Sequence, residues 1–167
     1  GEYNCQKTMD LEMEAASDYG VDFFPILWYY NEPDSEREPN SRFLNRALDE
    51  FIASPFAHRM TFFIEFCNHP PYEVTTDQQW QECLDSWEKY ITHPSYMKVD
   101  GRAVFKIHGA NHFIDQNNGD IGRCVQQLDS IRALFAKHGM EVIIGAGVMS
   151  SEHVDADNPI SKVVDFT

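Results

Sequence analysis

Apolar residues recur along the chain with two different spacings, one helical and one strand-like. The spacing of Met9, Met13 and Ala16 predicts a first helix that Thr8 caps and Gly20 ends. The same spacing predicts further helices around residues 44–52, 76–91 and 121–135. Nearly continuous apolar runs predict buried strands at residues 21–30, 60–67, 103–108, 141–148 and 163–167.

Helices and strands alternate along the chain, and this order predicts an α/β fold with a parallel sheet. Residues 31–40 are polar and predict a loop, while Asp100-Gly101 predicts a tight turn. Two architectures fit this order, an open doubly wound sheet and a (β/α) barrel of TIM type. The open sheet is typically marked by a glycine-rich phosphate loop, which no predicted strand end carries. The sequence therefore favours the barrel.

The length of the chain sets how much of a barrel it can form. A full barrel takes roughly 250 residues and eight strands, and this chain has 167 residues. We therefore expect a single domain over residues 1–167, a partial barrel of about five strands that lacks the first strand and the last ones.

Charge and hydropathy exclude some classes of partner. There are 13 Lys and Arg residues against 27 Asp and Glu, a net charge of −14, which disfavours nucleic acid and anionic membrane surfaces. No apolar run approaches the length of about 18 residues that a membrane-spanning helix needs. Among the four cysteines, Cys67 and Cys83 lie in apolar patterns typical of buried thiols, although an even count also permits two disulfides.

Candidate chemistry gathers where the predicted strands end, because barrel active sites lie at the carboxyl ends of the strands. Trp28, Tyr29 and Tyr30 end the first strand, and flat aromatic faces suit stacking on sugar rings. Glu65 lies inside an apolar strand, so its carboxylate must face a partner, water or a ligand. We predict Glu65 as the catalytic residue, since glycoside cleavage needs an acid. A structural ion pair is the alternative.

Amide and imidazole groups follow the next strands and suit directional bonds to hydroxyls. Asn68, His69 and His108 are the predicted substrate-binding residues, with a loop cap or a satisfied strand-end histidine as the structural alternatives. The same strand ends also carry Asn111, His112, Asp165, Gly145 and Gly147. The acidic residues Asp34, Glu36 and Glu38 are predicted to belong to a solvated loop. Glu152 and Asp155 form a carboxylate pair three residues apart in another loop, which we interpret as an accidental pairing.

Several other chemistries find no support in the sequence. His69, His108 and His112 lack a recognised metal-ligand spacing, so no metal and no cofactor is predicted. There is no Gly-x-Ser-x-Gly elbow for a nucleophilic serine. Cys67 lies two residues from His69, but a reactive thiolate needs an electropositive setting that this acidic chain does not offer.

Three segments resemble one family of barrel proteins. Residues 10–20 (DLEMEAASDYG) followed by residues 21–30 (VDFFPILWYY) resemble the opening of the glycoside hydrolase family 99-like group, which includes the WbsX-type proteins. Residues 93–104 (HPSYMKVDGRAV) resemble the His-Pro-x-Tyr-x-x-Val-Asp-Gly-Lys/Arg-Pro-Val stretch of that group. Residues 60–66 (MTFFIEF) are similar to its third strand.

The resemblance implies a (β/α)₈ barrel that acts on glycans without a metal, by retaining cleavage of internal α-mannosidic bonds. It also favours an extracytoplasmic location. Members of the group carry a catalytic Glu-x-x-Glu pair after a later strand, and no such spacing occurs in these 167 residues. The sequence departs from the group at residues 67–71 and at Ala103, where the group has proline.

These observations leave three functional hypotheses. The leading one is a glycoside hydrolase acting on a polysaccharide or glycan. A WbsX-type glycosyltransferase of polysaccharide biosynthesis is the second, and a non-catalytic glycan-binding barrel is the third.

Overall fold

Four parallel strands form the centre of the molecule. The computed structural model describes residues 5–30, 43–147, 160 and 163–166. The parallel strands are β1 (Phe23–Tyr29), β2 (Thr61–Cys67), β4 (Arg102–Ile107) and β5 (Val142–Ala146). They pair as neighbours in the order in which they follow one another along the chain, β1-β2-β4-β5. The predicted α/β class with a parallel sheet is therefore confirmed.

A short antiparallel strand, β3 (Lys98–Val99), precedes β4 and pairs with its first residues. The turn between them is formed by Asp100 and Gly101, with φ angles of 50° and 80°. Positive φ at both central residues is typical of the tight hairpin turn that the Asp-Gly pair predicted. The hairpin brings Tyr96 beside Phe62 of β2, with ring centroids 5.3 Å apart.

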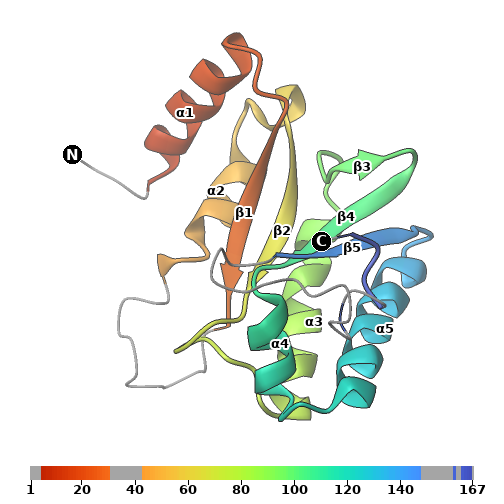
Figure 1. Ribbon diagram of the computed structural model, residues 1–167. Helices are drawn as coiled ribbons and strands as arrows, with labels where there is room; N and C mark the ends of the chain where they lie inside the picture. The colour runs from red at the N-terminus through yellow and green to blue at the C-terminus, as the bar shows by residue number, and fades with distance from the viewer. Residues whose placement is uncertain (1–4, 31–42, 148–159, 161–162, 167) are drawn as a thin grey trace.

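Helices α3 (Asp77–Ile91) and α5 (Ile121–Lys137) pack side by side on one face of the sheet (Figure 1). The strand side chains beneath them are large and apolar because every second residue of a strand points to the same face. Trp87 of α3 lies between Phe66 and Phe105, with ring centroids 5.5 Å and 4.9 Å away, and Phe135 of α5 continues this layer. These side chains are fully buried and form the core.

Two smaller helices lie beside β1, and a 3₁₀ turn leads into β2. Helix α1 (Gln6–Asp18) packs on α2 (Arg46–Ala53), and Phe51 of α2 reaches Phe24 and Phe62 of the sheet. The 3₁₀ turn η2 (Ala57–Arg59) follows α2. No helix within the described residues is long and apolar enough to cross a membrane.

The helix boundaries confirm part of the sequence prediction and correct part of it. Thr76 caps α3 as predicted, in a reciprocal capping box with Gln79. Gly139 ends α5 with a φ of 70°. Helix α1 starts earlier than predicted, because Gln6 is its first residue and Cys5, not Thr8, is the N-cap.

Two other predictions of secondary structure need correction. The fifth strand predicted at residues 163–167 is present in the described part of the chain only as one parallel bridge, between Gly145 and Phe166. A helix that the sequence pattern missed, α4 (Ala110–Gln116), follows β4. The loop predicted at residues 31–40 and the acidic residues predicted for loops, Asp34, Glu36, Glu38, Glu152 and Asp155, lie outside the described residues.

The cysteines are thiols, in agreement with the interpretation of the sequence. No disulfide joins Cys5, Cys67, Cys83 and Cys124, and the last three are buried. Burial raises the pKa of Cys83 well above its usual value, which keeps this thiol protonated.

Candidate functional site

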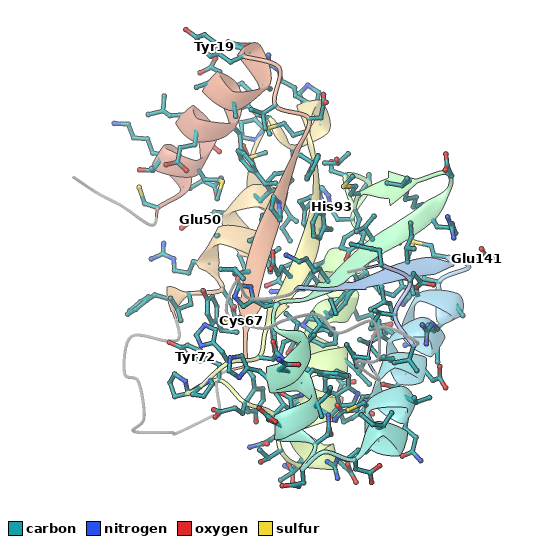
Figure 2. All side chains as sticks on the ribbon, viewed as in Figure 1. Tyr19, Glu50, Cys67, Tyr72, His93 and Glu141 are labelled. Carbon is teal, nitrogen blue, oxygen red and sulfur yellow. The ribbon has the colours of Figure 1, made fainter. Side chains whose placement is uncertain are left out.

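Polar side chains gather on the sheet face opposite α3 and α5, which we call the site face. The strand register places Leu27, Glu65, Lys106 and Gly145 in one row across this face. The row lies near the carboxyl ends of the four parallel strands. In α/β folds these ends share one edge of the sheet and carry the ligand sites. Figure 2 labels Cys67 and Tyr72 close to this edge, with Tyr19 at the other end of the molecule.

Glu65 is the centre of the row. Its side chain is buried, with the whole residue 8% exposed. Its Oε1 atom accepts from Lys106 Nζ at 2.8 Å and from His108 Nδ1 at 2.7 Å. Because a carboxylate only accepts, His108 donates through Nδ1 and directs its second ring nitrogen, Nε2, away from Glu65. Both donors meet Oε1, and Oε2 makes no hydrogen bond with the described residues.

Tyr29 and Cys67 form the next register pair on the site face, two residues closer to the edge. Burial, and then the neighbouring Cys67, raise the pKa of Tyr29 to about 12. Burial also raises the pKa of Cys67 to about 11, against the hydrogen bonds from the His69 backbone and from Tyr29 that lower it. Both groups are therefore protonated near neutral pH, and Cys67 is not a thiolate nucleophile.

The loop after β2 brings aromatic and imidazole rings over this edge. The His69 ring lies 5.7 Å from His108, 5.9 Å from Tyr72 and 6.4 Å from His112, between centroids. Its Nδ1 atom donates to the Pro70 carbonyl at 2.7 Å. The three histidines thus come together, but the described residues contain no group of three or more side chains placed to hold a metal ion.

Asn68 is fully buried, and its amide is used within the protein. Its Nδ2 donates to the Gly109 carbonyl at 2.8 Å, and its Oδ1 accepts from the Gly109 amide at 2.9 Å. The side chain thereby joins the loop after β2 to the loop after β4. Its amide pairs with the backbone of Gly109 in the way that the peptide group of a neighbouring strand would. The sequence predicted Asn68 as a substrate contact; the structure places it beneath the site, where it positions these two loops.

The three consecutive aromatic residues at the end of β1, Trp28 and Tyr29 within the strand and Tyr30 just after it, do not share one face, because successive residues of an extended chain point to opposite sides. Tyr29 lies on the site face, 4.8 Å from Tyr72 between ring centroids. Trp28 lies on the helix side and is 4% exposed, with its ring 5.3 Å from Trp87. Tyr30 also points to the helices, where its hydroxyl donates to Glu82 at 2.7 Å. Of this predicted stacking triplet, only Tyr29 reaches the site.

Two residues predicted at a strand end lie on a helix instead. Asn111 and His112 belong to the first turns of α4, which packs at the carboxyl end of β4 (Figure 1). A pocket of about 410 Å³ starts at His112 and continues between α4 and the loop after β2, where Glu73 and Asp115 line it. This pocket extends the polar surface away from the row of Glu65.

Gly145 lies in β5 and Gly147 lies just after it. Because neither has a side chain, other groups can approach the backbone closely at both positions. A Cβ atom on Gly147 would lie 2.2 Å from the carbonyl oxygen of His108. A Cβ atom on Gly145 would lie 2.2 Å from the ring of Phe166. Asp165 is held to the same strand, because its Oδ2 accepts from the Ile144 amide at 2.8 Å. The glycines therefore serve packing around the site, as glycines inside strands commonly do.

Lys106 is the member of the site that sequence reasoning missed. It is the single charged residue within the apolar run of β4 after Arg102, and it pairs with Glu65 in the register. A lysine and a glutamate at matching depth in two apolar strands are a signal for this ion pair. The pairing of the two strands was not known from the sequence.

No family model, curated protein or solved structure matches this chain.

Proposed function

We propose that this chain forms part of a carbohydrate-active (β/α) barrel, and that it contributes to the hydrolysis of glycosidic bonds in a polysaccharide or glycan. The order of the parallel strands supports the barrel. A doubly wound sheet reverses its strand order at a switch point, and the order β1-β2-β4-β5 contains no reversal. The resemblance to the glycoside hydrolase family 99-like group favours the same architecture and glycan chemistry.

The observation that carries the proposal is the hydrogen bonding of the Glu65 carboxylate, since both of its donors bond to the same oxygen. A carboxylate in an apolar strand costs several kcal/mol, on the order of 3 or more, unless donors compensate for the lost water. Lys106 and His108 are donors of this kind, and both of them bond to Oε1. The second oxygen, Oε2, is thereby left to accept from a ligand, and sugar hydroxyls are donors of the matching kind.

Neighbouring groups supply the other interactions that a glycan needs. Tyr29 and Tyr72 contribute aromatic surface at the carboxyl edge, and His69 contributes a second imidazole near His108. In this proposal Glu65 and His108 contact the substrate near the bond that is cleaved. Because His108 uses its Nδ1–H to donate a hydrogen bond to Glu65, its Nε2 atom is the ring nitrogen that exchanges a proton with the substrate oxygen.

Product release from a panel of soluble α- and β-linked polysaccharides tests the proposal. The full native chain, Glu65→Gln and Glu141→Gln are compared, with products detected as new reducing ends. Glu141 is an exposed carboxylate just before β5, at the opposite end of the strands from the site, and it serves as the matched control. We expect release from one linkage class, a loss of at least tenfold in Glu65→Gln, and an unchanged rate in Glu141→Gln.

The other outcomes separate the remaining hypotheses. Wild-type rates in a folded Glu65→Gln variant would remove Glu65 from the site and would contradict the proposal. Saturable glycan binding without any product would favour the non-catalytic glycan-binding barrel. Product that forms only when a nucleotide-sugar or lipid-linked donor is added would favour the glycosyltransferase.

A further inference from the structure

An exposed aromatic ring lies on the site face next to the row of Glu65. Phe166 pairs with Gly145 through a parallel bridge, and its carbonyl accepts from the Ala146 amide at 3.0 Å. Paired residues of neighbouring strands point to the same face of a sheet. The Phe166 side chain therefore extends the row Leu27-Glu65-Lys106-Gly145 by one position.

The far end of the ring reaches over Gly145. Three ring atoms lie within 2.2–2.8 Å of the point where a Cβ of Gly145 would be. Gly145 is buried, whereas Phe166 is 43% exposed. The far end of the ring is thus held over the backbone of β5, while the residue keeps a large exposed surface.

The position of the ring relative to the polar groups is set by the sheet. Gly145 is the register partner of Lys106, and Lys106 is the partner of Glu65. Neighbouring strands lie about 4.8 Å apart, so the ring over Gly145 lies roughly one strand spacing from Lys106 and two from Glu65. The apolar ring of Phe166 and a group of hydrogen-bonding side chains therefore lie next to each other on one surface.

We propose that Phe166 is the platform on which one sugar ring of the ligand stacks, while its hydroxyls bond to Glu65 and Lys106. The inference rests on the proposed function, because it names the subsite of the same glycan site. A pyranose has an apolar C–H face and a rim of hydroxyls, and this surface presents both complements side by side. Gly145 is the specificity element of the subsite, since any side chain there would displace the ring.

Affinity gel electrophoresis with soluble α- and β-linked glucans, mannans and xylans tests the inference. The variants are Phe166→Ala, Phe166→Leu, Phe166→Tyr and Gly145→Ala. We expect Phe166→Ala to weaken binding of the retained glycan roughly tenfold, the loss typical of one aromatic contact. Phe166→Leu keeps apolar bulk without a flat ring and is expected to lose most of the affinity, whereas Phe166→Tyr keeps it. Gly145→Ala is expected to behave as Phe166→Ala.

Phe23→Ala is the matched control. Phe23 is 40% exposed, close to the value for Phe166, and lies at the amino end of β1, where its ring contacts Phe63. Unchanged binding in Phe23→Ala shows that loss of an exposed phenylalanine alone has no effect. Thermal unfolding of each variant verifies that it is folded.

The results distinguish the inference from the function on which it rests. If Glu65→Gln loses binding while folded Phe166→Ala binds the glycan fully, Phe166 is not the stacking platform, although Glu65 still belongs to the glycan site. Full glycan binding by Phe166→Leu would show that Phe166 contributes only apolar packing, and it would also contradict the platform. If the wild-type chain binds no glycan at all, both the proposed function and the platform are wrong.

Discussion

Replacing Asn68 by alanine should destabilise the fold, because the side chain bonds only to buried backbone. Asn68 is fully buried, and both of its hydrogen bonds go to Gly109, at 2.8 Å and 2.9 Å. The Asn68→Ala variant leaves the Gly109 amide without a partner and removes one of the two donors to the Gly109 carbonyl, which still accepts from the Phe113 amide at 3.0 Å. An orphaned buried donor costs about 1–3 kcal/mol and a lost hydrogen bond about 0.5–1.5 kcal/mol, so we expect the free energy of unfolding to fall by about 2–4 kcal/mol.

Urea denaturation followed by tryptophan fluorescence measures this loss. Trp28, Trp80 and Trp87 are buried, so unfolding changes their surroundings. Asn45→Ala is the matched control, because Asn45 makes the same pair of bonds with the amide and carbonyl of Tyr29, at 2.8 Å and 2.7 Å. Asn45 is only half-buried, and water can replace it, so we expect a loss of about 1 kcal/mol or less.

Two results would show that Asn68 does not hold the two loops together. One is a stability of Asn68→Ala within about 0.5 kcal/mol of the wild type, which is the range of neutral surface changes. The other is a loss in Asn45→Ala as large as that in Asn68→Ala. Weaker glycan binding in an Asn68→Ala variant of unchanged stability would return Asn68 to the role of a direct substrate contact.

Two further predictions concern stability. Thr76→Ala removes the acceptor of the Gln79 amide at 3.2 Å and should lower the free energy of unfolding in urea by about 1 kcal/mol. Thr92→Ala, at the exposed other end of α3, is the control and should change this free energy little. Burial raises the pKa of Tyr90 from 10.0 to about 12, so the fold favours the neutral phenol. Its contribution is complete below pH 10 and is lost as the pH rises towards 12; Tyr90→Phe should show a shallower fall of unfolding free energy over that range, and an identical fall would contradict the assignment.

The fold class was predictable because the apolar runs are long and unambiguous. β2 is buried at six of its seven positions, which is how a strand covered on both faces is recognised in a sequence. Helix α4 was missed because its polar residues, Asn111 and His112, follow directly on a strand and gave no helical spacing. Its buried residues, Ala110, Phe113 and Gln116, include a glutamine, which weakened the apolar pattern.

The candidate site was predictable only in part, because a site depends on which strands are neighbours. Glu65 could be found alone, as a carboxylate in an apolar strand. Its partner Lys106 and the ring of Phe166 required the register that pairs β2 with β4 and β4 with β5. Trp28 was misplaced for a local reason, since strand alternation sends it to the opposite face from Tyr29.

The most direct test of the central claim, that the carboxyl edge of the site face binds a glycan, is amide NMR mapping. The ¹⁵N-labelled chain is titrated with the same soluble glucans, mannans and xylans, with and without Glu65→Gln. We expect one glycan to shift the amides of Glu65, His69 and His108, to leave that of Phe23 unmoved, and to have no effect on the Glu65→Gln variant. Shifts confined to the amino ends of the strands or to the outer faces of α3 and α5 would contradict the claim.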